Sequence, residues 1–378
     1  MIISWNTTNE CNLRCRHCYR DAKDKAGEEL TTAEGLALIE EIVRAGFKVM
    51  IFSGGEPLLR PDIHTLVEHA HKSGLRPVFG TNGTLLTPAT ARRLKEAGAQ
   101  VMGISLDSVD PGRHDHWRGS PGAWQAAVEG MRVCREAGLP FQVNTTVVDW
   151  NYREIEDLTD FAVEKGARAH HIFFLVPTGR AVNIEEESLR SAQYEDLLRR
   201  ILQKQLQVDI ELKPTCAPQF MRIARQLGIK TRFTRGCLAG VAYCIIDPQG
   251  NVQPCAYLNI QLGNVREVRF SELWRDHPVL HRLRSGAYQG ACGACAYRKI
   301  CGGCRARAYF YTGDYMAEEP WCDYRGSEGG ESDNESPIFE GVAHGSVRFH
   351  HKEQKPPACR PLCQERHMRR AGNETRRR

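Results

Sequence analysis

The chain of 378 residues has no long apolar run, and no stretch approaches the roughly 20 apolar residues that a membrane-spanning helix needs. Its first residues form an apolar segment at once, without the basic stretch that begins a secretion signal. No long basic run occurs before residue 366, and the net charge is only +5. These absences predict a cytoplasmic protein that has no membrane span and no nucleic-acid partner.

The composition is that of a folded chain with many thiols. Hydrophobic residues make up 41% of the chain and charged residues 26%, which is sufficient to bury a core. The 15 cysteines cluster at C-x2-C and C-x3-C spacings. In a chain without a secretion signal, this spacing indicates ligands of a metal or cluster rather than disulfide bonds.

Three cysteines lie together near the start of the chain: Cys11, Cys15 and Cys18, at the spacing C-x3-C-x2-C. Thiolates at this spacing on one tight loop can hold one face of a four-iron cluster and leave one iron open to a small molecule. Tyr19 follows the third thiol and is placed to shield such a cluster from water. The spacing alone also allows a zinc site with His17 as the fourth ligand, or disulfide partners.

Short apolar runs alternate with amphipathic segments over the first two hundred residues. Expected strands cover residues 2–5, 49–53, 76–80, 101–106, 141–148 and 170–176. Expected helices cover residues 31–45, 61–73, 88–97, 122–137, 152–165 and 189–205. Six strand–helix units of about 30 residues predict an α/β fold of parallel strands with right-handed crossovers, as an open sheet or a barrel.

Glycine and small polar residues follow the expected strands. The second strand is followed by Gly54, Gly55, Glu56 and Pro57, and glycines allow backbone to approach a ligand closely. Small polar or basic side chains follow the later strands, namely Asn82, Ser105, Asn144, Thr178 and Arg180. They suit hydroxyl groups and a carboxylate, although such residues also commonly satisfy loop backbone.

The cysteine loop, its following aromatic residue and the loop at 54–57 together resemble the radical S-adenosylmethionine (SAM) enzymes. The resemblance implies a partial (βα)6 barrel with chemistry at the carboxyl ends of its strands. It also implies a [4Fe-4S] cluster on Cys11, Cys15 and Cys18 whose open iron chelates SAM. A flavodoxin or ferredoxin would supply the electron that releases a 5′-deoxyadenosyl radical. SAM contacts are expected from Tyr19, Gly54, Gly55, Glu56, Pro57, Asn82, Ser105, Asn144, Thr178 and Arg180.

A second group of cysteines begins after residue 215, where the strand–helix alternation stops. Eight of them, from Cys237 to Cys322, allow two structural zinc sites. The pattern also resembles the SPASM domain, which implies one or two auxiliary [4Fe-4S] clusters. The resemblance forms one ligand set from Cys237, Cys244, Cys255 and Cys304. It forms the other set from Cys292, Cys295, Cys301 and Cys322. One spacing departs from the family pattern, because Cys301-x2-Cys304 replaces C-x3-C, and Cys216 falls outside it.

Four further side chains are candidates for substrate contact: His170, His171, Asp107 and Arg222. Alternation along a strand places one of the two histidines inside the barrel and the other against a helix. A hydrogen-bonded core histidine and a structural turn carboxylate are equally compatible with the pattern.

Composition and pattern divide the chain into a barrel over residues 1–210, a SPASM-type domain over 211–326 and a disordered tail over 327–378. The tail has few large apolar residues, too few to offset the entropy of ordering. Its Cys359 and Cys363 form a loose pair without further ligands.

Longer blocks at residues 4–9, 169–180 and 213–220 resemble radical SAM/SPASM enzymes that modify tetrapyrroles. The lack of an extension before the first strand favours the heme synthase branch, which implies an iron-tetrapyrrole substrate. The implied reaction converts two propionates of Fe-coproporphyrin III to vinyl groups, giving heme b, and Arg180 or Arg222 would pair the remaining propionates. Removal of acetate groups from 12,18-didecarboxysiroheme, a heme d1 step, peptide maturation and a non-enzymatic iron–sulfur or zinc carrier remain alternatives.

Overall fold

The computed structural model describes residues 1–25 and 27–326. The chain divides into a compact unit, Met1–Gly330, and a second unit, Glu331–Arg378. The tail that the sequence predicts to be disordered, with Cys359 and Cys363, lies outside the described residues. No helix of the described residues is both long enough and apolar enough to cross a membrane.

A ten-stranded sheet forms the centre of the first unit, in the order β10-β9-β8-β1-β2-β3-β4-β5-β6-β7. The strands are β1 (Ile2–Asn6), β2 (Val49–Ser53), β3 (Arg76–Thr81), β4 (Val101–Ser105), β5 (Phe141–Val147), β6 (Ala169–Phe174), β7 (Glu211–Thr215), β8 (Tyr243–Ile246), β9 (Asn251–Gln253) and β10 (Gly263–Asn264). Strands β8 and β1 to β7 are parallel, and the hairpin of β8, β9 and β10 is antiparallel. The six predicted parallel strands are therefore confirmed, and β7 and β8 extend the same sheet at its two ends.

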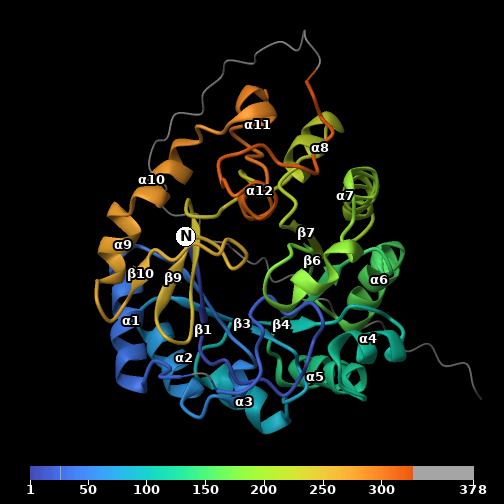
Figure 1. The fold of residues 1–378 in the computed structure, drawn as a ribbon. Coiled ribbons are helices and arrows are strands. Elements are labelled where there is room, and N and C mark those ends of the chain that lie inside the picture. The colour runs from blue at the N-terminus through green and yellow to red at the C-terminus, as the bar shows by residue number, and fades with distance from the viewer. Residues whose placement is uncertain (26, 327–378) are drawn as a thin grey trace, which may run out of the picture. The chain divides into compact units, whose positions relative to one another are not determined.

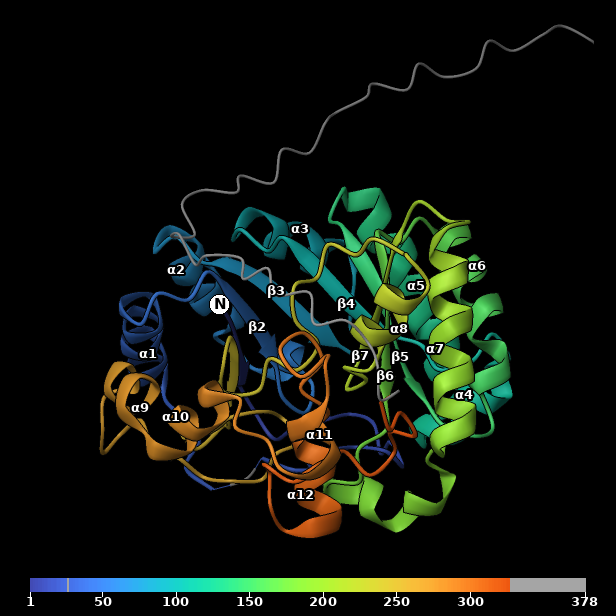
Figure 2. The same cartoon turned by 90° about the horizontal axis from the view of Figure 1, so that it is seen from above.

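Helices follow the parallel strands and pack on the outer side of the curved sheet, as Figures 1 and 2 show. They are α1 (Thr32–Arg44), α2 (Ile63–Lys72), α3 (Pro88–Glu96), α4 (Pro111–Arg118), α5 (Ala123–Ala137), α6 (Ile155–Lys165) and α7 (Ser191–Gln205). The six predicted helices correspond to all of these except α4. The later helices are α8 (Phe220–Gln226), α9 (Phe270–Asp276), α10 (Pro278–Ser285), α11 (Gly290–Ala294) and α12 (Arg305–Thr312).

Local signals account for where the helices start and stop. Thr31 caps α1, and its side chain accepts from the backbone N–H of Glu34 while Glu34 accepts from the backbone of Thr31. Thr87 caps α3 ahead of Pro88. Gly138 and Gly166 follow α5 and α6 with positive φ angles of 63° and 88°.

The two faces of the sheet differ in exposure. The outer face is buried against the helices, with Trp5, Phe52 and Ile104 fully buried in the main core. The residues that alternate with them are less buried, as in β5, where buried and partly exposed positions alternate along the strand. The inner face of the sheet is therefore the side on which a ligand can lie.

Division of the first unit at residue 210 stays a prediction. Strand β8 lies beside β1, with Ile3 paired to Cys244, although they are far apart in the chain. The predicted hairpin at 242–254 is present as β8 and β9, with Gly250 in its turn at φ 91°. The segment after residue 210 thus shares its sheet with the barrel strands.

Candidate active site

The cysteine loop lies after β1, and its three thiols are close together. Cys11 and Cys18 pack with Cys15 on Leu13 and Ala123, and Cys15 is 9% exposed. The backbone N–H of Leu13 lies 3.5 Å from Cys11 Sγ, and that of Ala22 lies 3.4 Å from Cys18 Sγ. Donors aimed at sulfur favour the thiolate form, which is the form that binds metal.

Burial sets the protonation of these thiols when no metal is bound. It raises the pKa of Cys11 to about 12, and the charges of Glu56, Cys15 and Cys18 add to the rise against the Leu13 hydrogen bond. Burial also raises the pKa of Cys15. Such thiols are protonated at neutral pH unless a metal displaces the proton, so the donor set fits a soft, positively charged group.

The spacing of the thiols bears on the zinc alternative. Among residues 1–25 and 27–326, no three His, Cys, Asp or Glu side chains are close enough to hold a single metal ion. His17 stacks on Trp117, with ring centroids 4.9 Å apart. Thiolates on different irons of a cluster lie farther apart than the ligands of one ion, so the geometry favours a cluster over zinc.

The loop after β2 holds the chain that leads into the cysteine loop. The backbone N–H of Gly55 donates to Thr8 O at 2.7 Å, and that of Glu56 donates to Glu10 O at 2.7 Å. A side chain at Gly54 would strike the backbone of Thr8, and one at Gly55 would strike the backbone of Glu10. The two glycines are therefore required by close packing of two backbone segments.

Glu56 is buried and joins the ends of β2 and β3. Its carboxylate accepts from Thr81 Oγ1 at 2.7 Å, from the Asn82 N–H at 2.8 Å and from the Leu58 N–H at 3.2 Å. Burial raises the pKa of Glu56 to about 7 despite these bonds. Asn82 Nδ2 in turn donates to Asn12 Oδ1 at 2.8 Å, so the two predicted SAM residues also support the cysteine loop.

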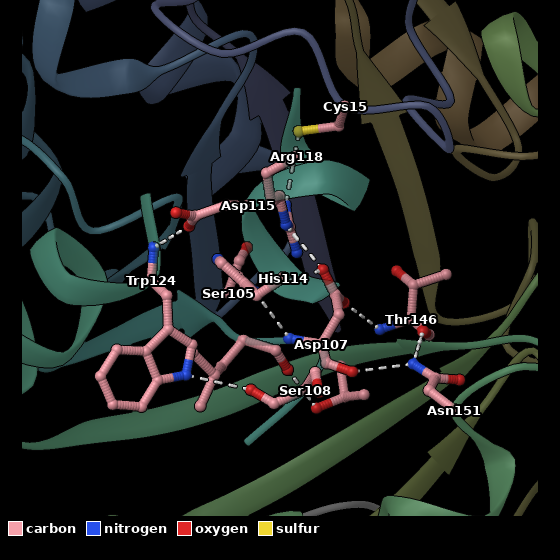
Figure 3. Close-up of polar contacts among 12 residues, drawn as sticks. Cys15, Ser105, Asp107, Ser108, His114, Asp115, Arg118, Trp124, Thr146 and Asn151 are labelled. Carbon is pink, nitrogen blue, oxygen red and sulfur yellow. Dashed lines mark hydrogen bonds and ion pairs between the residues drawn. The ribbon is translucent and has the colours of Figure 1, made fainter. Parts of the chain in front are cut away.

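An ion pair that the sequence did not indicate lies beside Cys15. Arg118, the last residue of α4, donates to Asp107 Oδ2 at 2.7 Å, and its Nη1 lies 3.7 Å from Cys15 Sγ. Asp107 is fully buried and accepts from the Thr146 N–H at 2.8 Å. Figure 3 shows Arg118 between Asp107 and Cys15. Asp107, a candidate for substrate contact, is thus engaged with the support of the cysteine loop.

The carboxyl end of α4 also contacts the cysteine loop through backbone. Arg118 O accepts from the Arg14 N–H at 3.1 Å, and Trp117 O accepts from the Arg16 N–H at 3.0 Å. No apolar pattern marks α4, whose sequence is P-G-R-H-D-H-W-R. The Asp110–Pro111 pair, a helix cap followed by proline, is the signal that would have indicated it.

Arg180 supports the same loop from the far end of the barrel. Its Nε donates to Cys15 O at 2.9 Å, and its Nη1 donates to Asp21 Oδ1 at 2.7 Å and to Ala22 O at 2.9 Å. Gly179 lies against the backbone of Cys18 and Tyr19. Thr178, at the start of this segment, contacts only Val176 O at 3.5 Å among the described hydrogen bonds. Arg180 therefore positions the cysteine loop.

Four polar side chains form a continuous row on the inner face of the sheet. Strand pairing places Ser105 beside Asn144, Asn144 beside His171 and His171 beside Lys213. Partners in a parallel sheet point to the same face, and all four side chains are partly exposed. Two predicted SAM residues and one predicted substrate residue thus share a wall with Lys213, which the sequence analysis did not select.

The two histidines of β6 have different surroundings. His170 is buried on the outer face, where Thr145 Oγ1 and Thr159 Oγ1 contact its ring nitrogens at 2.8 and 2.9 Å. His171 faces inward, with Gln142 Nε2 at 3.0 Å from Nδ1 and Glu211 Oε1 at 3.2 Å from Nε2. The inward histidine is the one that can contact substrate, and His170 is a core residue.

The predicted set of Cys292, Cys295, Cys301 and Cys322 lines one cavity. Arg222 lies in the same wall, where it donates to Glu195 Oε2 at 2.7 Å and stacks over Tyr324. The geometry brings these four thiols together as the sequence predicts. It places Arg222 beside them and not on the inner face of the barrel.

The other predicted set is divided in the structure. Cys237, Cys255 and Cys304 interact electrostatically with one another, and Cys304 carries a pKa raised by burial to about 11. Cys244 does not join them, because it is fully buried on the outer side of β8, and the only neighbouring charge acting on its thiol is that of Arg284. Cys216, which the sequence pattern left out, interacts with the three instead.

Aromatic residues lie between the cysteine loop and the Cys237 group. The rings of Tyr19 and Tyr257 have centroids 5.4 Å apart, and Tyr19 Oη donates to Asn6 Oδ1 at 2.9 Å. Tyr243 Oη donates to Ser4 Oγ at 3.0 Å on the same inner face. Tyr19 therefore packs between Cys18, its neighbour in sequence, and the segment that follows Cys255.

Two family models match the chain: the radical SAM superfamily over residues 5–162 and the SPASM iron-sulfur cluster-binding domain over residues 237–304. The chain is 44% identical to the AdoMet-dependent heme synthase of Methanosarcina barkeri, over 86% of this chain and 96% of that protein. It is 31% identical to the Fe-coproporphyrin III synthase of the same organism, over 85% of this chain and 87% of that protein.

A solved structure with the same fold is that of SuiB from Streptococcus suis bound to S-adenosylmethionine. It has a TM-score of 0.66 and 17% identity, and the match covers 85% of this chain and 77% of that chain. The similarity therefore supports the fold that the strand order defines. With both cysteine-bearing segments matched and the heme synthase aligned over nearly its whole length, the chain belongs to the radical SAM enzymes with a SPASM domain, in the tetrapyrrole-modifying group that contains the AdoMet-dependent heme synthases.

Proposed function

We propose that this enzyme converts Fe-coproporphyrin III to heme b by oxidative decarboxylation of two propionates. The observation that carries the proposal is the near full-length similarity to AdoMet-dependent heme synthases, which exceeds the similarity to the Fe-coproporphyrin III synthase. The reaction takes one hydrogen atom from the β-carbon of each propionate. Loss of carbon dioxide and one electron then leaves a vinyl group.

Cys11, Cys15 and Cys18 would hold the SAM-binding [4Fe-4S] cluster, which the buried donor set fits. When bound, the cluster supplies the electron that cleaves SAM and so provides the radical that takes the hydrogen atom. The protein's part is to fix the loop: Arg118 and Arg180 contact it at Cys15, and the backbone at Gly55 supports its start. A positioned loop matters because a misplaced radical reacts with the wrong atom.

SAM would lie between the cysteine loop and the inner wall. Ser105 and Asn144 of the polar row would face its ribose, and backbone at residues 54–57 would face its amino group. Tyr19, Asn82 and Thr178 border the same space. Glu56 and Arg180 would act by positioning, because their polar atoms already bind the cysteine loop or its supports.

The substrate would meet the other half of the polar row. Lys213 on β7 and the nearby Arg232 bring two positive charges to one carboxylate, Glu211, which pairs with Arg232. One positive charge is thus left to pair a propionate, and charge-assisted bonds suit that task. His171, held by Glu211, lies next to Lys213 and would contact the macrocycle or its iron.

The SPASM cysteines would hold auxiliary clusters, which can accept the electron left after each decarboxylation. A flavodoxin or ferredoxin would supply the electron for SAM cleavage, in the cytoplasm where such donors work. The thiols that fit these roles are Cys237, Cys255, Cys304, Cys292, Cys295, Cys301 and Cys322.

Anaerobic incubation of the reconstituted, reduced protein with SAM and Fe-coproporphyrin III tests the proposal. Mass spectrometry should find the divinyl product, heme b, together with 5′-deoxyadenosine. Turnover of 12,18-didecarboxysiroheme or of a peptide without formation of heme b would reject the proposed substrate. Absence of 5′-deoxyadenosine with every substrate would instead indicate a carrier of electrons or heme.

A further inference from the structure

Cys216 has an unusual backbone at the end of the inner wall. It directly follows β7 and has φ 59°, one of two positive values among the described residues other than glycine. This conformation costs a non-glycine residue roughly 1–2 kcal/mol. The surrounding structure holds it in place: Cys216 O accepts from Arg307 Nη2 at 3.1 Å and from Tyr194 Oη at 3.4 Å.

The bond from Arg307 ties Cys216 to Cys304. Cys304 is the N-terminal capping residue of α12, and Arg307 lies in the first turn of that helix. Glu319 completes the connection, since it pairs with Arg307 at 3.3 Å and accepts from the Cys304 N–H at 2.6 Å. The Arg307–Glu319 pair is fully buried, so this arrangement is fixed.

A second set of contacts brings Cys237 to the same place. Gly236 packs directly on Pro218, two residues after Cys216, and a side chain at Gly236 would overlap Pro218. The N–H of Gly236 donates to Ile300 O at 2.7 Å, and the N–H of Cys237 donates to Cys301 O at 3.2 Å. Cys237 is thereby held between the segment of Cys216 and the segment that leads to Cys304.

Cys255 completes the group through the loop that precedes β8. The N–H of Gly240 donates to Pro254 O at 3.0 Å, which joins the neighbours of Cys237 and Cys255. The charges of Cys304, Cys255 and Cys237 all act on the Cys216 thiol, in addition to its burial, and raise its pKa well above the usual value. Four thiols from four segments therefore face one another.

Cys244 points the other way. In β8 it pairs in register with Ile3, whose side chain lies in the helix-covered core. The neighbouring Tyr243 faces inward, toward Ser4 and Cys255. Because side chains alternate along a strand, a thiol at 244 cannot lie on the side of Tyr243 without a change of register.

We propose that Cys216 is the fourth ligand of the auxiliary cluster held by Cys237, Cys255 and Cys304, and that Cys244 is a structural core residue. The inference rests on the proposed iron–sulfur chemistry but not on the identity of the tetrapyrrole. Cys216 comes three residues after Lys213 of the polar row. The cluster would then be bonded to the strand that forms the substrate wall, which places an electron acceptor at the edge of that wall.

Full-length protein lacking the thiols of Cys11, Cys15 and Cys18 isolates the auxiliary clusters for the test. In this background, Cys216→Gly removes the thiol while glycine keeps the positive φ angle without strain. Cys244→Ala is the matched control. Iron and sulfide content, and the EPR spectrum of the reduced protein, are read for each variant after anaerobic reconstitution.

The proposal predicts that Cys216→Gly loses one cluster's content of iron and sulfide, or keeps a cluster with an altered EPR spectrum. Cys244→Ala should keep both the content and the spectrum of the parent. Unchanged content and spectrum in Cys216→Gly, or loss of a cluster in Cys244→Ala, would overturn it. If Cys216→Gly does not fold, Cys216→Ser is read by EPR, where an oxygen ligand must alter the spectrum and an unaltered one rejects the assignment. Neither result depends on heme formation, so failure of the proposed function is a separate outcome.

Discussion

Arg118 Nη1 lies 3.7 Å from Cys15 Sγ, which places a buried positive charge against one thiol of the SAM-binding site. A positive donor at a cluster ligand stabilises the reduced, more negative form. Arg118→Gln should therefore lower the reduction potential of this cluster. A hydrogen bond to a charged group contributes about 1.5 kcal/mol, which corresponds to roughly 60 mV for a one-electron couple.

EPR-monitored redox titration measures this shift. Arg118→Lys keeps the charge and should change the potential less than Arg118→Gln. Loss of Arg118 also leaves Asp107 buried without its partner, so thermal unfolding of both variants is measured in parallel. Equal potentials in the parent and in folded Arg118→Gln would show that the contact has no effect on the cluster.

Gly55→Ala should prevent assembly of the SAM-binding cluster. The added carbon would overlap the Glu10 backbone next to Cys11, and overpacking of this kind costs typically 1–3 kcal/mol. We expect a lower melting temperature and loss of iron from the first site. Gly112→Ala, where only the Asp110 side chain is near at 3.3 Å, is the control and should keep both properties. Full iron content in Gly55→Ala would contradict the packing argument.

Lys213→Met should weaken substrate binding. Lys213 lies on the inner wall beside His171, and loss of a charge-assisted bond to a propionate costs roughly 1.5–3 kcal/mol. The expected result is an increase in KM of about tenfold or more, with a smaller change in kcat. Lys213→Arg should retain most of the affinity, and exposed Lys48→Met, before β2 at the opposite end of the sheet, should have no effect. An unchanged KM in Lys213→Met would remove Lys213 from the substrate site.

His170→Gln should reduce the loss of stability in mild acid. Burial lowers the pKa of His170 to about 3, so below pH ~6.5 the unfolded chain binds a proton that the folded chain does not. Stability from this group is complete above that pH and falls by about 1.4 kcal/mol per pH unit as the pH drops toward 3. Melting temperatures at pH 6.5 and 5.5 should differ less in His170→Gln than in the parent. The exposed His281→Gln serves as control, and equal pH dependence in all three proteins would contradict the assignment.

The sequence predicts what depends on local pattern. The six parallel strands and their helices follow from periodicity, and residues 11–18 carry the cysteine spacing within a single loop. The set containing Cys292 and Cys322 is also brought together as expected, since three of its four thiols lie within ten residues.

Long-range placement accounts for what the sequence does not predict. Cys244 satisfies a spacing, but its register beside Ile3 turns it away from the other thiols. Cys216 reaches them only because Arg307 and Pro218 fix its segment, and neither contact has a sequence signature. Arg118 is missed for the same reason, because its helix lacks apolar periodicity and its partners come from β4 and the cysteine loop.

Transfer of hydrogen from the substrate tests the central claim most directly. Fe-coproporphyrin III deuterated at the β-carbons of its propionates is incubated with the reduced enzyme and SAM. The account predicts deuterium in 5′-deoxyadenosine and, in the same sample, vinyl groups on the product. Formation of unlabelled 5′-deoxyadenosine with no vinyl product would show that the radical does not act on a propionate of this tetrapyrrole.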